Sequence, residues 1–347
     1  MTIRDTLGRV FQPGLIADIP TGNLLWVDAV NGNDDLAVRG RMTVPFKTLT
    51  KAKTAAASGD TIMVLPGTYN EKNLLKNGVN WHFLPGASVI YLGTAAGGIF
   101  DTSSDGSNGG VTSMITGWGN FQISEPTTAG HVVHSAAGYS ELLIQAKKMV
   151  SYDSACVKTG SSGVLDIQVL EGIESSSGRV VEIFGGTQNF IRARRLYTSG
   201  GAGLYVSAGS VDLEAQYISS SADSAISIAG GSGSNIVVRA YEIYAGTKSA
   251  IYYNASSNPT LTILGARIVS AGGTAADGRA VRIDSNSSNK VKLANCVLIA
   301  SSAATESIYA ATSNTKVHLL NGAAANKDVH ANVGYYGGAF AWNAAIT

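Results

Sequence analysis

Short stretches of alternating apolar and polar residues recur along most of the chain, and turns rich in Gly, Ser and Asn separate them. From about residue 139 onward, each repeat contains one longer and one shorter stretch. The longer stretches span 142–150, 165–173, 190–197, 212–218, 237–244, 262–269 and 292–299. The shorter ones span 155–159, 180–184, 203–207, 225–229, 250–254, 280–284 and 307–311. Because the alternation has a period of two, it predicts β-strands with one buried face.

Equivalent positions in successive repeats predict one solenoid coil per repeat. They are 22 to 30 residues apart and fall at Gln145, Gln168, Arg192, Glu214, Arg239, Leu264 and Ala294. Leucine-rich repeats have a similar period, but their Leu/Asn consensus is missing here, and a β-propeller requires repeats of about 40 residues or more. We therefore predict an all-β fold, a right-handed parallel β-helix.

The segment before the repeats contains three motifs of another kind. They are VDAVNGND at 27–34, PFKTL at 45–49 and GDTIMVLPGTY at 59–69. This succession resembles the opening coils of the pectin-lyase-like superfamily. The resemblance implies a short helix over 48–57 that caps the solenoid, and such a cap protects an otherwise open strand edge and core.

Three regions are expected: an N-terminal arm over 1–24, the β-helix over 25–314 and a C-terminal tail over 315–347. The tail resembles the ends of bacteriophage tail-spike and fibre proteins, which pack around a trimer axis. This resemblance implies a homotrimeric virion structural protein. Its arm would attach to other tail proteins and its solenoid would bind polysaccharide on the host surface. The alternative location is outside the cell, as a secreted protein.

Composition narrows the partners further. Charged residues are 14% and the formal net charge is +1, against about 25% charged residues in average proteins. Without a basic cluster, a nucleic-acid partner has no electrostatic support. No apolar run approaches the about 18 residues of a membrane span, and we expect no secretory signal. The two cysteines, Cys156 and Cys296, lie in different repeats, so we expect no disulfide framework, metal or cofactor.

The longer strands predict two outward columns of side chains. One runs Gln145, Gln168, Arg192, Glu214, Arg239, and the other runs Lys148, Glu171, Arg195, Tyr217, Glu242, Arg267. Because charges of opposite sign alternate, surface ion pairs are favoured over catalysis for Glu171, Glu214 and Glu242. Asp34 and Asp35 are assigned to a turn. His131 and His134, three residues apart in a strand, are expected on opposite faces.

The shorter strands predict a third column, and it carries the functional hypothesis. It runs Val157, Glu182, Tyr205, Ser227, Tyr252, Arg282, Tyr309. Exposed tyrosines among charged residues can stack on sugar rings, so Tyr205, Tyr252, Tyr309 and Arg282 are candidate carbohydrate-binding residues. The same column fits an intersubunit surface equally well. A non-catalytic adhesive module is a third hypothesis.

An alternative function is a polysaccharide depolymerase, either a hydrolase or a lyase. A hydrolase needs two carboxylates that flank one glycosidic bond. The candidates are Asp153, Glu174, Glu182 and Asp284, with Glu182 as the first to test. No catalytic set stands out, and the sequence leans away from an enzyme.

Overall fold

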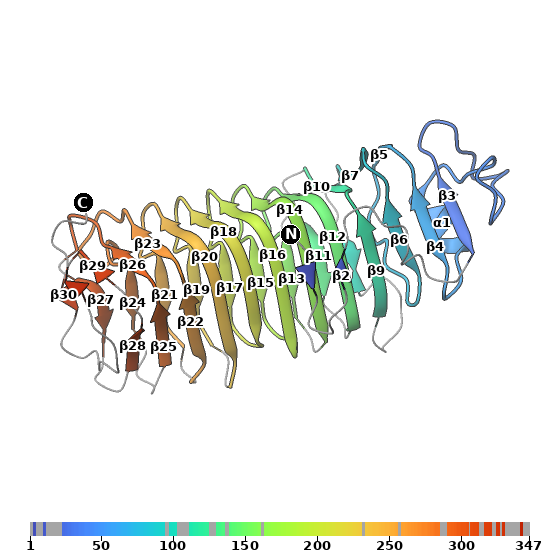
Figure 1. The fold of residues 1–347 in the computed structure, drawn as a ribbon. Helices are drawn as coiled ribbons and strands as arrows, with labels where there is room; N and C mark the ends of the chain where they lie inside the picture. The colour runs from blue at the N-terminus through green and yellow to red at the C-terminus, as the bar shows by residue number, and fades with distance from the viewer. Residues whose placement is uncertain are drawn as a thin grey trace.

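The computed structural model is a parallel β-helix in which short strands stack along one axis (Figure 1). It describes residues 3–4, 10–11, 23–93, 97–102, 111–124, 130–135, 139–160, 163–230, 233–255, 258–284, 290–304, 306–311, 316–320, 324–326, 328–329 and 341–342. Within these ranges, two large sheets contain only parallel pairs, and Ile3–Arg4 (β1) pairs antiparallel with Val10–Phe11 (β2).

The larger sheet has 19 strands among the described residues. They are Leu24–Val27 (β3), Thr61–Val64 (β4), Gly67–Tyr69 (β5), Asn80–Phe83 (β6), Ala87–Tyr91 (β7), Val111–Gly117 (β9), Asn120–Ile123 (β10), Tyr139–Ser151 (β12), Val164–Ser175 (β14), Gln188–Thr198 (β16), Val211–Ser220 (β18), Asn235–Ala245 (β20), Thr260–Leu264 (β22), Arg267–Ser270 (β23), Lys290–Ala294 (β25), Val297–Ile299 (β26), Lys316–Leu320 (β28), Ala324–Ala325 (β29) and Ala341–Trp342 (β31).

The smaller sheet has 10 strands in the described part of the chain. They are Gly97–Asp101 (β8), Gly130–Ser135 (β11), Val157–Thr159 (β13), Val181–Ile183 (β15), Leu204–Val206 (β17), Ile226–Ile228 (β19), Ile251–Tyr253 (β21), Val281–Ile283 (β24), Glu306–Ala310 (β27) and Asp328–Val329 (β30). The stack continues past residue 314, since β28 pairs with β25 and β30 pairs with β27. The roles expected of 1–24 and 315–347 stay predictions.

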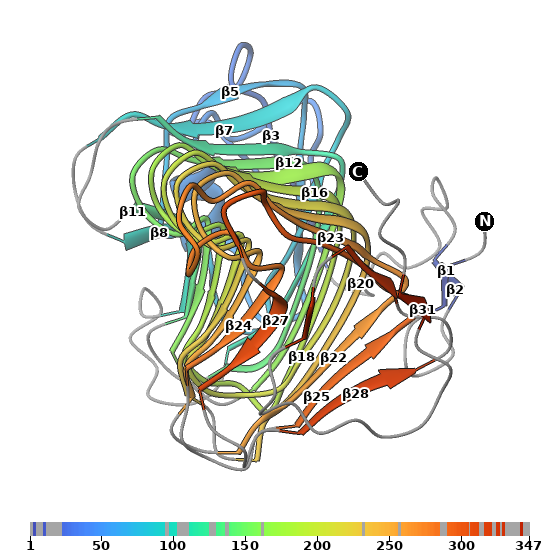
Figure 2. The ribbon, with the colours of Figure 1, turned by 90° about the vertical axis from the view of Figure 1, so that its left-hand side faces the viewer.

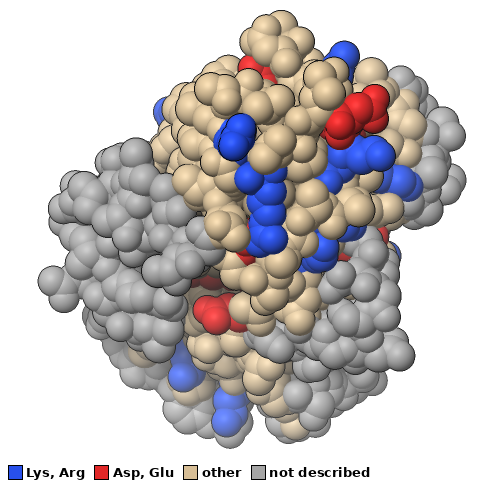
Figure 3. Space-filling view, turned by 90° about the vertical axis from the view of Figure 1, so that its right-hand side faces the viewer, with Lys and Arg blue, Asp and Glu red and all other residues tan. Residues whose placement is uncertain are grey.

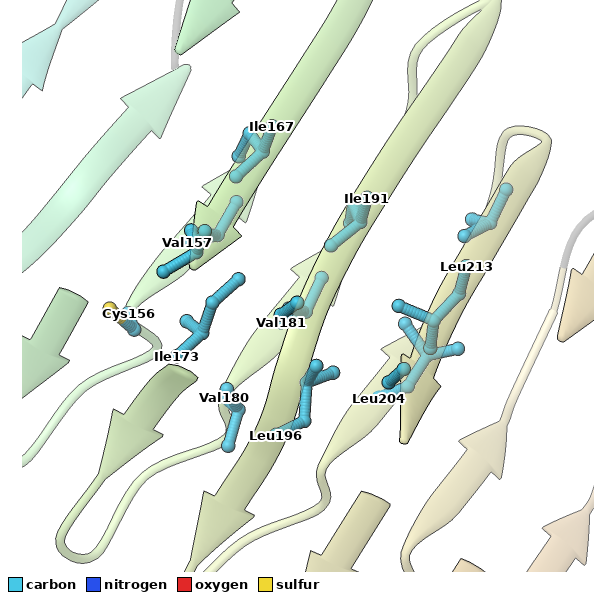
Figure 4. Packing of buried hydrophobic residues seen from close by; sticks show 14 of the residues in the cluster. Cys156, Val157, Ile167, Ile173, Val180, Val181, Ile191, Leu196, Leu204 and Leu213 are labelled. Carbon is cyan, nitrogen blue, oxygen red and sulfur yellow. The ribbon is translucent and has the colours of Figure 1, made fainter. Parts of the chain in front are cut away.

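Strand pairing confirms the predicted coil register. In the larger sheet, Gln145 pairs with Gln168, which pairs with Arg192, and the column continues to Glu214 and Arg239 as predicted. Inward positions then form aliphatic rows of fully buried residues, such as Ile144, Ile167, Ile191, Leu213, Val238, Ile263 and Leu293. Figure 4 shows several of these side chains meeting inside the coil, where each buried aliphatic residue contributes about 1.5–3 kcal/mol.

A buried row of hydroxyl groups satisfies the turns at one corner of the coil. Ser151, Ser175, Thr198, Ser220 and Ser270 are buried and donate hydrogen bonds to turn carbonyls at 2.6–3.1 Å. Since a buried carbonyl without a donor is costly, small hydroxyl residues recur at this corner.

The predicted capping helix is present as Leu49–Ala55 (α1), with Thr48 as its N-cap. Asp34 accepts hydrogen bonds from the Lys47 and Thr48 amides at 2.8 and 3.0 Å, and Glu71 accepts from the next two amides. These carboxylates satisfy amides that have no partner within the helix. Among the described residues, no helix is long and apolar enough to cross a membrane.

Candidate functional site

The outward column of the smaller sheet follows the prediction with one correction. Pairing aligns Glu182, Tyr205, Ser227, Tyr252, Arg282 and Tyr309 in successive coils. Val157, predicted to head this column, is fully buried, and Lys158 pairs with Glu182 instead. In a strand of period two, Val157 and Thr159 fill the core and Lys158 must point outward.

The three candidate tyrosines are half-buried, and guanidinium groups lie over their rings. Arg179 lies 3.5 Å from the Tyr205 ring centroid, Arg279 lies 3.9 Å from that of Tyr309, and Arg282 lies 5.5 Å from that of Tyr252. Such cation–π contacts occupy part of each ring. The ring edge therefore remains the main contact that these tyrosines offer to a ligand, since the Tyr252 hydroxyl is also hydrogen-bonded to Asp284 and Asn254.

An open groove lies where the chain turns into β13, β15 and β17. Its volume is about 450 Å³, and its lining includes His131, Asp153, Lys158, Arg179, Glu182 and Asp223. With Gly201, the lining spans five successive coils, from β11 to the turn before β19. The groove thus brings together two of the four carboxylates proposed from sequence, Asp153 and Glu182. It also adds Asp223, which the sequence pattern did not single out.

Glycines allow the turns that line the groove to approach closely. A Cβ on Gly200 would lie 1.9 Å from the Ser177 carbonyl oxygen, and one on Gly178 would lie 2.6 Å from the Ser154 carbonyl carbon. Any side chain at these positions would collide with the neighbouring backbone. Gly178, Gly200 and Gly201 therefore let neighbouring turns pack against one another beside the groove.

Glu182 is a buried anchor for the cations of the groove. Only 8% of the residue is exposed. Its carboxylate accepts a hydrogen bond from Arg179 and lies 3.7 Å from Lys158 Nζ. An ionised carboxylate between two cations is suited to holding them in place. Glu182 therefore contributes to the groove by positioning Arg179 and Lys158.

Asp153 and Asp223 have a different environment. Asp153 is exposed and accepts a hydrogen bond from Ser177 Oγ at 2.7 Å, while half-buried Asp223 accepts one from the Ser224 amide at 2.7 Å. Neither carboxylate forms an ion pair within the described residues. Both therefore keep acceptor oxygens for a ligand that carries hydroxyl groups.

The prediction that His131 and His134 lie on opposite faces is wrong, because β11 contains a bulge. The amides of Val132 and Val133 both donate to the Cys156 carbonyl, at 2.9 and 3.0 Å. This irregularity breaks the alternation, and the two imidazole rings stack with their centroids 4.9 Å apart. His134 Nδ1 lies 3.0 Å from Asp101 Oδ2.

His131 reaches the groove as a neutral side chain. Burial lowers its pKa from 6.5 to about 4. Its Nδ1 donates to the Ala155 carbonyl at 2.6 Å. In this tautomer, Nε2 is an acceptor.

The other candidate carboxylates are paired outside the groove. Burial alone would raise the pKa of Glu174, but hydrogen bonds from Arg195 and Lys148 outweigh it and lower the pKa. Asp284 lies 2.6 Å from Arg282 Nη2. The predicted neighbour of Lys148 was Glu171, and this is wrong: a bulge pairs Lys148 with Gly172.

Ion pairs line the larger sheet as expected, but several partners differ from the prediction: Glu174, not Glu171, pairs with Arg195, and Asp212, not Glu214, pairs with Arg239. Glu171 pairs with Lys147 at 3.5 Å, and Glu242 pairs with Arg267 at 2.6 Å. Glu214 lies 3.8 Å from Arg192, while Arg239 pairs with Asp212. Within the described ranges, no group of three or more His, Cys, Asp or Glu residues could hold a metal ion.

One family model matches part of the capping region. Residues 30–76 match the model of a family described as "Protein of unknown function (DUF1565)". No curated protein and no solved structure matches the chain. The matched segment covers the loop before α1, the helix itself and the first full coil.

Proposed function

We propose that this chain binds a polysaccharide in the groove and along the outward face of the smaller sheet. The observation that carries the proposal is the set of polar groups in the groove. Asp153, Asp223 and His131 Nε2 supply acceptors, and Lys158 and Arg179 supply donors. Sugar hydroxyls both donate and accept hydrogen bonds, so a glycan complements this mixed lining.

The column beyond the groove extends the proposed binding face. Tyr205, Tyr252, Arg282 and Tyr309 follow in register. Neighbouring coils are about 4.8 Å apart, so an extended glycan would meet several of these side chains at once. Tyr252→Ala should weaken binding of the glycan.

The biological setting that we propose is the virion of a bacteriophage. The opening motifs and the tail support a right-handed, homotrimeric tail-spike or fibre protein that binds a host-surface glycan, with secretion as the alternative. This step is an analogy, since one fold serves many functions.

A glycan panel tests the binding proposal. The full chain should bind at least one capsular or lipopolysaccharide glycan, and the double variant Asp153→Asn/Asp223→Asn should bind it about tenfold more weakly. Asp35→Asn is the matched control, because Asp35 is exposed and lies far along the chain in the capping loop. Absence of binding across the panel, or equal loss in the control, contradicts the proposal.

The second candidate function is a polysaccharide depolymerase. It is favoured by one observation: Asp153, Glu182 and Asp223, from three different coils, line one groove. Glycoside hydrolysis uses two such carboxylates. Release of reducing ends that Asp153→Asn, Asp223→Asn or Glu182→Gln abolishes would support it. Intact glycan after prolonged incubation would count against it.

A further inference from the structure

The loop between β3 and α1 exposes an unusual share of large apolar side chains. Val30, Leu36, Val38 and Met42 are 76%, 65%, 42% and 55% exposed. Single exposed apolar residues are common on protein surfaces, but four of them within one solvent-exposed loop indicate an interaction surface.

This loop has a fixed conformation. Two hydrogen bonds join its backbone to β3, from Phe46 N to Trp26 O at 2.8 Å and from Gly40 N to Leu24 O at 3.0 Å. A further hydrogen bond joins Val38 N to Val44 O at 3.1 Å. Asp34 also ties the loop to the start of α1. The apolar side chains are therefore presented by an ordered scaffold and would lose little entropy on binding.

Three exposed cations accompany the apolar residues. Arg41 belongs to the loop, and Lys47 and Lys51 lie just before and on α1. None of the three forms an ion pair within the described residues. The nearby acids Asp34 and Glu71 accept hydrogen bonds from backbone amides, and Asp60 pairs with Arg39. Asp35 is an exposed acid of the same loop. The loop with Lys47 and Lys51 still has a net charge of +2, since it contains four Lys and Arg residues and two Asp residues. Figure 3 shows several Lys and Arg side chains on this end of the solenoid, with Asp and Glu side chains beside some of them.

We propose that this end face, defined as the 30–42 loop together with Lys47 and Lys51, docks a separate protein whose surface combines acidic and apolar side chains. Complementary charge selects this occupant over two others. Residues 1–22 carry Arg4 and Arg9 against Asp5 and Asp18, so this segment has no excess of acid. A second copy would present the same cations and be repelled.

Fluorescence anisotropy with the full chain tests the proposal. The probe is a labelled amphipathic peptide of Glu, Leu and Ala, and its counterpart has Lys in place of every Glu. The acidic peptide should bind about tenfold more tightly than the basic one, and added salt should weaken it. Lys47→Glu/Lys51→Glu should abolish this preference, and Leu36→Ser/Met42→Ser should weaken binding with the charge unchanged.

The matched control is Lys290→Glu/Lys292→Glu, which makes the same charge change on β25, in the last coils of the solenoid. It should leave binding unchanged, and circular dichroism should report the same fold for all variants. Equal loss in the control, or equal binding of both peptides, overturns the proposal. Cross-linking of Lys47 or Lys51 to the N-terminal amine within one chain, without peptide binding, assigns the surface to residues 1–22 and also overturns it.

Discussion

At the scale of single residues, β-bulges decide which side chains meet. The bulge in β11 brings His131 and His134 to one side of the strand. The register shift between β12 and β14 places Glu174, in place of Glu171, between Lys148 and Arg195. A bulge adds one residue and thereby reverses the faces that follow it. Local backbone irregularities thus set both the groove and the ion pairs.

His131 should make stability depend on pH. Its folded-state pKa of about 4 lies below the ordinary 6.5, so the unfolded chain binds the proton more tightly. The stabilising contribution is complete above about pH 6.5 and is lost as pH falls toward 4. From about pH 7.5 to about pH 5, the loss from this group should be about 2 kcal/mol.

Urea denaturation at both pH values measures this effect. In His131→Gln, the fall in unfolding free energy should be about 2 kcal/mol smaller than in the unsubstituted protein. The same fall in both proteins would show that His131 does not titrate as a buried group.

At the scale of elements, the strands follow the apolar pattern and the connections follow special residues. Alternating aliphatic residues specify the β12–β14–β16 stack, because each inward side chain lies above its equivalent. The turns between them depend on glycines whose neighbours leave no room for a Cβ. The cap depends on carboxylates that satisfy the first amides of α1.

Gly200→Ala should destabilise the fold by about 2–3 kcal/mol or more, because overpacking forces the backbone to move. The new methyl group would lie 1.9 Å from the Ser177 carbonyl oxygen. Gly273→Ala is the control: nothing lies within 4 Å of that position, and reduced freedom of the unfolded chain should make it neutral or stabilising by about 0.5 kcal/mol. Thermal unfolding of both variants measures the difference, and equal melting temperatures would refute the close-packing argument.

Asp34→Ala should cost about 1–2 kcal/mol, since it leaves amides at the start of α1 without an acceptor. Asp35→Ala removes a neighbouring exposed carboxylate that does not cap the helix, and it should change stability by less than about 0.5 kcal/mol. Urea denaturation compares the two. If both substitutions lower the free energy of unfolding by a similar amount, Asp34 stabilises the start of α1 through its negative charge alone and not through its hydrogen bonds.

At the scale of the whole molecule, one hydrophobic core runs the length of the solenoid. Seen along the axis in Figure 2, the coils lie over one another, so each coil is stabilised mainly by its neighbours. The larger sheet carries a band of exposed tyrosines on its outside, formed by Tyr197, Tyr217, Tyr241 and Tyr244. Aromatic side chains are typical of protein interfaces, and this band supports the proposed trimer.

Sedimentation velocity should give three times the chain mass of 35.8 kDa, about 107 kDa, for the trimer that we propose. Tyr217→Ser/Tyr241→Ser should shift the protein toward the monomer, because these rings are 41% and 66% exposed. Tyr152→Ser, at a turn and 45% exposed, is the control. A monomer at all accessible concentrations contradicts the trimer.

The sequence by itself determined the coil, its register and its cap. The alternation of apolar and polar residues assigns each residue to the inner or outer face of its strand, and the repeat length aligns each residue with its equivalent in the next coil. The assignment is reliable because stacked strands give equivalent residues the same environment. The sequence alone therefore places Tyr205, Tyr252 and Arg282 in one column of the smaller sheet, and strand pairing agrees. The cap was expected from the resemblance of the opening motifs, and α1 lies within two residues of the expected bounds.

Only the tertiary structure decided what lies together in the groove. Asp153 and Asp223 are on turns, where no periodicity relates them, and Gly178 and Gly201 lie among the turns that line the groove. The irregularities that place His131 and Glu174 interrupt the alternation within the strands, so the apolar pattern does not predict them. A repeating pattern specifies repeating contacts, whereas this groove is made at the places where the pattern is interrupted.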